Sequence, residues 1–397
     1  MAKVLDMEKK IFKLLKNGTC YIPEFIGKKD ILVVQNKIYK IENHIDESVV
    51  PDLEIIDCSG KIVCPGLIDQ HIHITGGGGE EGPGSRIPEI MLSECLTAGI
   101  TTAVGVLGAD SITRNISGLL AKARALEEEG LNTYIYTGSY RIPTATLTGS
   151  VMSDIALIDK IIGVGEIAVS DHRSSHPSLD MLKAVASEAR MGGLVGKKAG
   201  VVHIHVGDGK KGLEPVIELV ANSDFPIEMF VPTHLNRNRT LFFQAIEYAK
   251  MGGNIDLTAG ETNETGYAVP DALKLLADAG VDMDRVTVSS DANGSIPAKE
   301  GCGPGVGRAD ELINDIRSSI LSGKLTVEQA LKTVTVNVAK VLKLYPKKGV
   351  IRPGSDADIL VFGKEDLKLD KVFVNGEQFV NNGKVQKWGR YEEKWHG

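Results

Sequence analysis

Cysteines are few in this sequence of 397 residues, and no two of them are spaced as a redox or zinc-binding pair. The cysteines are odd in number and form no CxxC motif: Cys20, Cys58, Cys64, Cys95 and Cys302. This pattern favours reduced, mostly buried thiols over a disulfide framework or a zinc-thiolate site. A bound metal ion would therefore need ligands other than cysteine.

Long apolar runs and an excess of positive charge are also missing. Nowhere do 18 apolar residues follow one another, and the stretch MAKVLDMEKKIFKLLKN alternates charged with apolar residues, so we expect neither a membrane-spanning helix nor a secretory signal. The 45 Lys and Arg residues against 52 Asp and Glu give a net charge of −7 without a basic tail, unlike a nucleic-acid-binding protein. We therefore expect a cytoplasmic protein with a small-molecule substrate and with neither nucleic acid nor membrane as partner.

Short apolar segments alternate with amphipathic ones through the middle of the chain. The stretches between the apolar segments, such as 116–130, 178–193 and 240–253, have helical periodicity and close on glycine. The predicted strands are 61–74, 101–107, 132–140, 163–171, 200–208, 228–235, 254–260 and 285–291. Eight strand–helix units over about 280 residues predict an α/β fold, a TIM-type (β/α)8 barrel.

The two flanks of this region have a different pattern. Residues 1–63 and 347–397 read as short strands with turns, and neither piece is large enough for an obvious core of its own. We predict that they combine into one small β domain, and that residues 64–346 form the barrel. A chain of this length with 42% hydrophobic residues has enough material for one large core and a second, smaller domain.

Side chains of the types that bind metals gather at the ends of the predicted strands. His71 and His73 share one face of their strand, because side chains at positions i and i+2 point the same way. The carboxyl ends of barrel strands form the rim where TIM-barrel active sites are built. Nitrogen and oxygen ligands suit Zn²⁺, and six exceed the needs of one catalytic ion, so we predict two metal ions that share a bridging carboxylate and hydroxide. The six residues are His71, His73, Glu166, His205, His234 and Asp291.

Ordinary structural roles compete with the metal interpretation at single positions. An isolated HxH pair in a strand is more often a pair of plain polar residues than a metal site. His203 lies one layer below His205, and we interpret it as a buried, hydrogen-bonded histidine. Asp69 faces the same way as His71 but lies below the rim, where it would be at most a hydrogen-bond partner of a metal ligand. The metal interpretation is preferred because five separate strand ends carry ligand-type residues together.

This arrangement resembles the amidohydrolase superfamily, which has HxH on strand 1, a bridging ligand on strand 4, histidines on strands 5 and 6, and aspartate on strand 8. The segments VCPGLIDQHIH and GVIRPGSDADILVF look like its junctions with a small β-sandwich domain. Within the superfamily, the chain is similar to the isoaspartyl dipeptidase, or β-aspartyl peptidase, family over nearly its whole length. The most specific segments are DQHIHITGGGGEEGP, TGSYRIP, SDHRSSHP, PTHLNRN and SSDANGS.

The resemblance implies a zinc peptidase that hydrolyses the β-aspartyl bond of isoAsp-X dipeptides by attack of a hydroxide that bridges two metals. Asp291 would act first as base and then as acid, and Tyr140 would donate a hydrogen bond to the developing oxyanion. The implied zinc ligands are His71, His73 and Asp291 for one ion, and His205 and His234 for the other.

The resemblance also implies how the substrate is held. Glu80 would bind its free α-amino group, with Glu81 as the neighbouring alternative. The glycines around Gly78 lack a Cβ and so let the backbone approach the ligand. Carboxylates of the substrate would be held by Arg173, Arg237 and Ser295. A homo-oligomer is implied by the resemblance alone.

One position departs from the family pattern, which usually has a carboxylated lysine on strand 4 as the bridging ligand. Glu166 stands in this place, and its shorter side chain requires the strand to come closer to the metals. Gly165 beside it could allow a bulge that moves the carboxylate inward. Lys160 is the rival ligand, but it lies six residues upstream. We predict that Glu166 bridges the metals and that activity needs no bicarbonate.

Functions of other classes stay open at this point. Another binuclear-metal cyclic amidase or deacetylase of the superfamily would share the metal site and lack a group that binds a free α-amine. A non-catalytic scaffold of the same fold is disfavoured, because every ligand position carries a competent residue.

Overall fold

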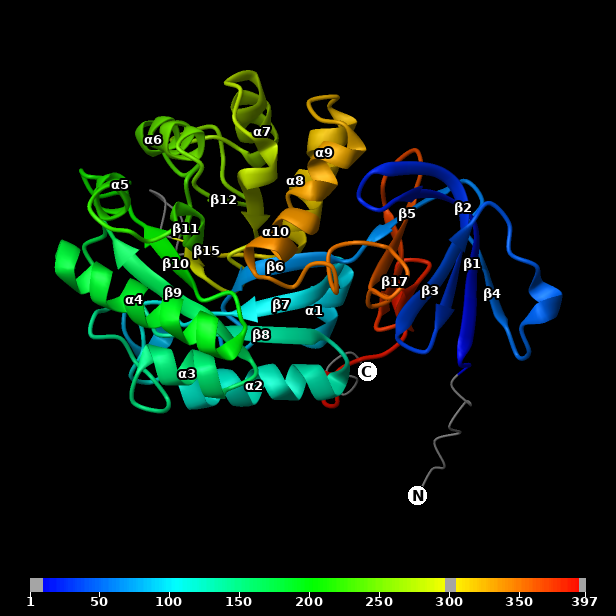
Figure 1. The fold of residues 1–397 in the computed structure, drawn as a ribbon, viewed down its shortest axis with the longest axis horizontal. Coiled ribbons are helices and arrows are strands. Elements are labelled where there is room, and N and C mark those ends of the chain that lie inside the picture. The colour runs from blue at the N-terminus through cyan, green and yellow to red at the C-terminus, as the bar shows by residue number, and fades with distance from the viewer. Residues whose placement is uncertain (1–9, 297–304, 393–397) are drawn as a thin grey trace.

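The computed structural model describes residues 10–296 and 305–392. They form two β regions, and the helices lie around the one that is built from the middle of the chain (Figure 1). Cys302 lies outside the described residues, as do residues 1–9 at the start of the predicted β domain. Among the described helices, none has the length and apolar character needed to span a membrane.

The eight segments predicted as barrel strands all contain parallel strands. Six make one sheet in the order β11-β10-β9-β8-β7-β6, and β12 pairs with β13. Backbone hydrogen bonds from Leu235 to Asp256 (3.3 Å) and from Asp291 to His71 (3.1 Å) connect this pair to the two edges of the sheet. The bounds are β6 Leu67–Ile72, β7 Ile100–Gly105, β8 Asn132–Thr137, β9 Ile161–Val169, β10 Val201–Val206, β11 Phe230–Thr233, β12 Ile255–Thr258 and β13 Val286–Ser289.

The predicted first strand, residues 61–74, is two strands that belong to different sheets. Gly66 separates β5 (Lys61–Pro65) from β6, because the chain leaves one sheet there and enters the other. A Cβ at Gly66 would overlap the side chain of Thr101, so the crossing requires glycine. The prediction of one continuous strand was wrong at this point.

Helices follow the parallel strands β6 to β13 and cover their outer side (Figure 1). Their bounds are α1 Leu92–Thr97, α2 Ile116–Glu129, α3 Val151–Leu157, α4 Leu179–Gly196, α5 Glu214–Ala221, α6 Arg239–Lys250, α7 Val269–Asp278, α8 Ala309–Leu321, α9 Val327–Lys332 and α10 Val336–Val341. Short 3₁₀ turns are η1 Glu47–Val49, η2 Pro83–Ser85, η3 Ile227–Met229 and η4 Met283–Arg285.

Two of the three predicted helix ends are confirmed. Gly130 closes α2 in the left-handed conformation (φ 117°), and Gly252 (φ 96°) follows α6. Helix α4 instead continues past Gly193 and ends at Gly196. A Cβ at Gly193 would lie 2.6 Å from the Cα of Gly200, so this glycine permits close packing within the helix and does not end it.

Strands from both flanks form one nine-stranded mixed sheet. Its order is β19-β18-β17-β16-β5-β1-β2-β3, with β4 beside β1. The antiparallel pair β5 and β16 joins strands from the two flanks in this sheet. The bounds are β1 Phe12–Tyr21, β2 Phe25–Val34, β3 Lys37–Glu42, β4 Glu54–Asp57, β16 Ile359–Gly363, β17 Leu369–Val374, β18 Glu377–Asn381 and β19 Lys384–Val385.

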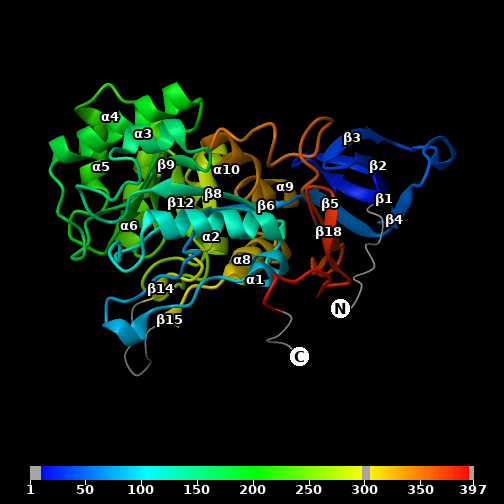
Figure 2. The same cartoon turned by 90° about the horizontal axis from the view of Figure 1, so that it is seen from below.

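A short antiparallel pair, β14 (Ser295–Ile296) and β15 (Gly305–Val306), belongs to neither sheet. In Figure 2 it projects from the barrel beside the blue segment that precedes α1. Both segments contribute side chains to the cavity described below.

The cysteines behave as the sequence predicted wherever the structure describes them. Four are free and buried: Cys20, Cys58, Cys64 and Cys95. Burial raises the pKa of the Cys20 and Cys58 thiols to about 12. These groups are therefore uncharged packing residues of the core.

Candidate active site

A cavity of about 600 Å³ opens at the carboxyl ends of the barrel strands. Of the twelve residues predicted for the site, nine line it: His73, Gly78, Glu80, Tyr140, Arg173, His205, Arg237, Asp291 and Ser295. The remaining three, His71, Glu166 and His234, are buried beneath it and contact the residues of its floor. The structure thus brings the predicted site residues together at the rim where TIM-barrel active sites lie.

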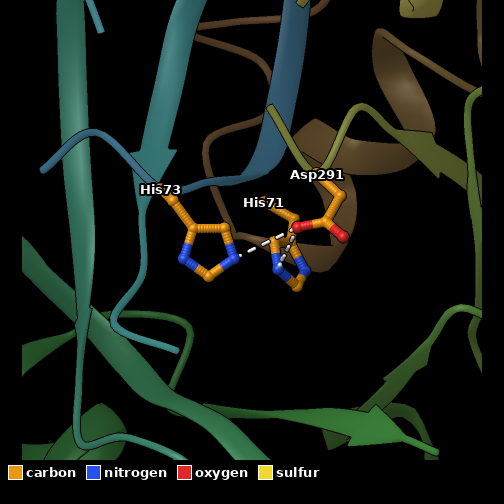
Figure 3. Close-up of side chains that lie close together, drawn as sticks. All are labelled: His71, His73 and Asp291. Carbon is orange, nitrogen blue, oxygen red and sulfur yellow. Dashed lines mark ion pairs between the residues drawn. The ribbon is translucent and has the colours of Figure 1, made fainter. Parts of the chain in front are cut away.

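The HxH pair and the aspartate after β13 face one another (Figure 3). Oδ1 of Asp291 lies 3.1 Å from Nε2 of His73 and 3.4 Å from Nε2 of His71. Neighbouring backbone holds this arrangement, because the Asp291 amide donates to the His71 carbonyl and the His73 amide donates to the Ala292 carbonyl. Asp291 adopts a left-handed conformation (φ 53°), as does His234 (φ 63°) after β11; such conformations often occur at functional sites.

Glu166 lies at the centre of the four histidines and is fully buried. Its Oε2 atom lies 3.3 Å from Nδ1 of His205, 3.4 Å from Nε2 of His71 and 3.6 Å from Nε2 of His234. Its Oε1 atom lies 3.5 Å from Nε2 of His73. One carboxylate therefore reaches every histidine of the predicted ligand set, which is the placement that a bridging ligand needs.

The polar atoms at this centre are suited to bind cations. Both Glu166 oxygens, Nε2 of His71 and Oδ1 of Asp291 are buried and accept or donate no hydrogen bond within the described part of the chain. Burial opposes the charge on Glu166, but the surrounding imidazoles, His71 above all, hold its pKa well below the usual range. Burial likewise opposes the charge on His71, but Glu166 and Asp291 raise its pKa to about 9. The carboxylates of Glu166 and Asp291 stabilise a positive charge on His71. The same negative charges would stabilise a metal cation bound between these side chains.

Two sets of side chains could each hold an ion, with ligand atoms within 4.8 Å of one another: His71, His73 and Asp291, and His71, Glu166 and His234. The first set is the one implied for one zinc ion by the resemblance. The donors are imidazole nitrogens and carboxylate oxygens, which fit Zn²⁺ and other divalent first-row metals.

A β-bulge moves Glu166 into the site. Between Val202 and Ile204 on β10 lies one residue, whereas two residues, Gly165 and Glu166, lie opposite on β9. The predicted irregularity at Gly165 is therefore present in the structure. A Cβ on Gly165 would lie 2.7 Å from the Cβ of His203 and 2.9 Å from its carbonyl oxygen, so only glycine allows β9 to approach β10 this closely.

Lys160, the rival ligand, precedes β9 at the opposite end of the strand. Its ammonium group pairs with Glu127 and donates a hydrogen bond to the carbonyl of Thr133 (3.0 Å). The side chain is thus engaged between α2 and β8, away from the histidines. Its position favours Glu166 as the carboxylate that replaces the family's modified lysine.

Each of three ligand histidines has a partner on its second ring nitrogen. Nδ1 of His71 lies 2.8 Å from Nε2 of His203, which is buried and hydrogen-bonded as predicted. Nε2 of His205 lies 2.9 Å from Asp171 and Nδ1 of His234 lies 2.8 Å from Thr258. Such partners orient metal ligands and select their tautomers. Asp69 contacts backbone amides of His71 and Ser290 and no ligand ring.

Asp171 and Thr258 are the site residues that the sequence analysis missed. Asp171 stands two residues before Arg173 in the segment SDHR, and this spacing was the available signal. Its carboxylate accepts two hydrogen bonds from the Arg173 guanidinium, from Nε at 3.0 Å and from a terminal nitrogen at 2.8 Å. The same carboxylate reaches His205, so it links the arginine to the ligand cluster.

Tyr140 lies over the ligand cluster, with its hydroxyl 2.9 Å from Nδ1 of His205. The Arg173 guanidinium lies 5.2 Å from the centroid of its ring. Burial and the nearby charge of Glu166 raise the pKa of Tyr140 well above the usual value. The hydroxyl therefore stays protonated at neutral pH and can donate a hydrogen bond.

The residues predicted to hold the substrate line the same cavity. Oε1 of Glu80 lies 3.2 Å from the Arg173 guanidinium and accepts a hydrogen bond from the Ser295 hydroxyl (3.0 Å). Arg237 lines the same cavity and donates one hydrogen bond to the Val206 carbonyl (3.2 Å). Gly78 has φ 73°, a conformation that places its backbone along the cavity at little steric cost.

Residues 62–379 match the amidohydrolase family model, and the chain belongs to this family. Over nearly its whole length it is similar to the β-aspartyl dipeptidase of Fervidobacterium islandicum AW-1, whose structure was solved in complex with β-Asp-Leu. The two chains are 44% identical with a TM-score of 0.89, over 95% of this chain and 98% of the other. A second structure of that enzyme gives 43% identity and a TM-score of 0.87, over 94% and 98%. The predicted resemblance is thereby confirmed.

Curated relatives match shorter parts of the chain. The dihydroorotase of Aquifex aeolicus is 32% identical over 192 residues, which are 45% of this chain and 40% of that protein. The dihydroorotase of Lactobacillus johnsonii is 28% identical over 232 residues, 55% of this chain and 50% of that protein. The matches thus span half of these relatives or less.

Proposed function

We propose that the chain is a metal-dependent dipeptidase that hydrolyses the β-aspartyl bond of isoAsp-X dipeptides. The observation that carries this proposal is the 44% identity, over 98% of its chain, to the β-aspartyl dipeptidase solved with β-Asp-Leu. The cavity supports it, since ligand-type residues line it together with Glu80, Arg173 and Ser295.

The fold is proposed to be a closed TIM-type barrel of the eight parallel strands, with a composite β-sandwich made from both flanks. The domain boundaries proposed are 1–63 with 347–397 for the sandwich, and 64–346 for the barrel. A cytoplasmic location and a homo-oligomer likewise stay predictions. Light scattering of the purified protein measures the subunit count.

The metal centre is proposed to hold two zinc ions per chain. His71, His73 and Asp291 would bind one ion, His205 and His234 the other, and Glu166 both. Bound divalent cations would polarise the scissile carbonyl and lower the pKa of water, which supplies the nucleophile.

Two side chains of the site would then assist the reaction. Tyr140 presents a protonated hydroxyl beside His205, where it can donate a hydrogen bond to the carbonyl oxygen as negative charge develops. Asp291 would take a proton from the attacking water and give it to the leaving amine. Its carboxylate stays ionised because the histidines hold its pKa far below the usual range against the effect of burial.

Substrate recognition is proposed to begin at Glu80. Its carboxylate faces the cavity with its charge partly balanced by Arg173, and a free α-ammonium group would be a matching partner. Arg173, Arg237 and Ser295 would hold the carboxylates of the dipeptide, since guanidinium groups bind such anions through two hydrogen bonds.

A cyclic amide substrate is the second candidate function. It is favoured by the likeness to dihydroorotases, which covers only half or less of those proteins. A cyclic amidase has no need of a carboxylate that binds a free amine, so Glu80 separates the two candidates.

The test compares β-Asp-Leu, α-Asp-Leu and N-acetyl-β-Asp-Leu as substrates, with the metal content measured on the same protein. We expect cleavage of β-Asp-Leu only, and about two zinc ions per chain. Glu80→Gln should lower kcat/KM for β-Asp-Leu by about 100-fold or more, the cost of an unpaired charge in a substrate site. Glu81→Gln, the matched control next to it, should keep most of the activity. Hydrolysis of dihydroorotate or hydantoin that survives Glu80→Gln would favour the second candidate.

A further inference from the structure

His203 lies on β10, two residues before His205 and directly below the ligand cluster. Its side chain is fully buried, and its Nε2 atom lies 2.8 Å from Nδ1 of His71. The two rings meet edge to face, with 4.9 Å between their centroids. Nε2 of His71 points the other way, 3.4 Å from both Glu166 and Asp291. His71 is thus held between a second imidazole and two carboxylates.

This contact decides which nitrogen of His71 carries its hydrogen. A ring nitrogen that binds a metal must be unprotonated, and Nε2 is the nitrogen that faces the carboxylates. The hydrogen of a neutral His71 then belongs on Nδ1, where Nε2 of His203 is the acceptor within reach. The opposite tautomer would place a hydrogen at the metal position, and Nε2 of His203 would then have to donate to Nδ1 of His71 across the 2.8 Å contact.

His203 is itself held in place by its surroundings. Its ring stacks on that of Tyr136, with 5.1 Å between centroids and 21° between planes. The β10 backbone at His203 lies against Gly165 of the bulge. The residue therefore contacts the two elements that carry His71 and Glu166.

We propose that His203 is a positioning residue of the metal centre, which accepts the Nδ1 hydrogen of His71 and so directs Nε2 of His71 towards the metal ion. Metal-ligating histidines usually give this hydrogen to a carboxylate, a carbonyl or water. A second imidazole does the same without adding negative charge to the barrel interior. The inference rests on the metal centre of the proposed function.

The test compares His203→Gln with His203→Leu. Glutamine places an amide oxygen about as far from Cβ as Nε2 of histidine, so a hydrogen-bond acceptor is retained. Leucine removes the acceptor but still fills much of the volume of the ring. Zinc affinity is measured on metal-free protein by competition with a chromogenic chelator. We expect affinity to fall about 10- to 100-fold for His203→Leu and to stay within about threefold of wild type for His203→Gln. His176→Leu, a change in the loop after β9, is the control.

Equal zinc affinity of His203→Leu and wild type would overturn the proposal, as would equal losses in the two His203 variants, which indicate packing alone. Failure of the wild-type protein to bind zinc would instead contradict the metal centre, and the positioning role with it. If His203→Leu does not fold, ¹⁵N spectra of the histidine-labelled, zinc-loaded wild type decide the matter, with His203→Gln used for assignment. We expect a hydrogen on Nδ1 of His71 and none on Nε2 of His203; a hydrogen on Nε2 of His203 would overturn the proposal.

Discussion

Glu166 stands where the family pattern has a longer, modified side chain. It reaches the four histidines at 3.3 to 3.6 Å, although its own side chain is shorter than a carboxylated lysine. The one extra residue of the bulge on β9 brings the Glu166 carboxylate closer to the histidines. A built-in carboxylate also requires no carbon dioxide for its formation.

Glu166→Gln should therefore remove the bridging charge and keep the volume. We expect the zinc content to fall below two per chain and kcat/KM to fall more than about 100-fold. Loss of a metal ligand should reduce activity more than the roughly 10- to 100-fold that is typical when a hydrogen-bond partner of a ligand is lost. Metal analysis and kinetics with β-Asp-Leu measure both. Wild-type apoprotein should regain full activity with zinc in bicarbonate-free buffer. Lys160→Arg, which preserves the pair with Glu127, should keep both metals; two zinc ions and full activity in Glu166→Gln would contradict the bridging role.

At the residue scale, the gathering of the candidate ligands was predictable, and the contacts of their partners were not. His71 and His73 are separated by two positions in a strand, and this spacing alone puts both on one face. Thr258 carries no such signal and Asp171 has only its spacing from Arg173, because their contacts depend on how loops and neighbouring strands meet. His203 could be predicted as buried, but the direction of its hydrogen bond required the structure.

At the scale of elements, glycines decide where strands approach each other. Gly66 lets the chain cross between two sheets, and Gly165 lets the bulge of β9 lie against β10. The sequence indicated the strands through their apolar residues. The break at Gly66 and the passage of α4 through Gly193 could not be predicted, because each depends on a neighbour distant in sequence, Thr101 in one case and Gly200 in the other.

Gly165→Ala tests the bulge. The added Cβ would meet His203 at 2.7 Å, so β9 must move away from β10 and take Glu166 with it. We expect a loss of about 1 to 3 kcal/mol in the free energy of unfolding, the usual cost of overpacking, together with weaker zinc binding. Urea denaturation and metal analysis measure these effects. The control is Gly118→Ala in α2, where the nearest atom to the new Cβ is 3.6 Å away; equal behaviour of the two variants would contradict the role of the bulge.

A half-buried carboxyl on α8 makes the stability of the fold depend on pH. Asp315 accepts a hydrogen bond from the Gly260 amide (2.9 Å), and burial raises its pKa from 3.8 to about 6. A raised carboxyl pKa favours the protonated folded state, so the fold loses stability as pH rises from about 4 to about 6.

Asp315→Asn should remove this loss and keep the hydrogen bond from Gly260. We expect the variant to gain about 1 to 3 kcal/mol at pH 7 and little or nothing below pH 4. Urea denaturation at several pH values measures the difference, with Asp224→Asn at an exposed position as control. A gain that does not change with pH would show that ionisation of Asp315 is not its cause.

On the scale of the whole molecule, a network of buried charges ties the mixed sheet to the barrel. Lys348 is 2% exposed and lies 2.7 Å from both Asp356 and Asp358. Asp358 also accepts hydrogen bonds from Asn132 on β8 (3.2 Å) and from the Asn375 amide (2.8 Å). The sequence predicted that the two flanks would combine, but not these contacts, because the charges stand in a turn-like segment that is typical of exposed loops.

Lys348→Met removes the charge from this network and keeps the length of the side chain. The buried Asp358 then loses its cation and Asp356 keeps only its pair with Lys37, so the free energy of unfolding should fall by about 3 to 5 kcal/mol at pH 7. Lys348 holds the pKa of Asp356 below the usual range although burial opposes this, so its contribution is present above about pH 4 and is lost as pH falls. The difference in the free energy of unfolding between wild type and Lys348→Met should therefore become smaller at acidic pH. Thermal and urea unfolding between pH 3 and pH 8 measure it, with Lys364→Met at an exposed position as control. A deficit equal at pH 3 and pH 8 would mean that Lys348 stabilises the junction through packing of its alkyl chain and not through its charge.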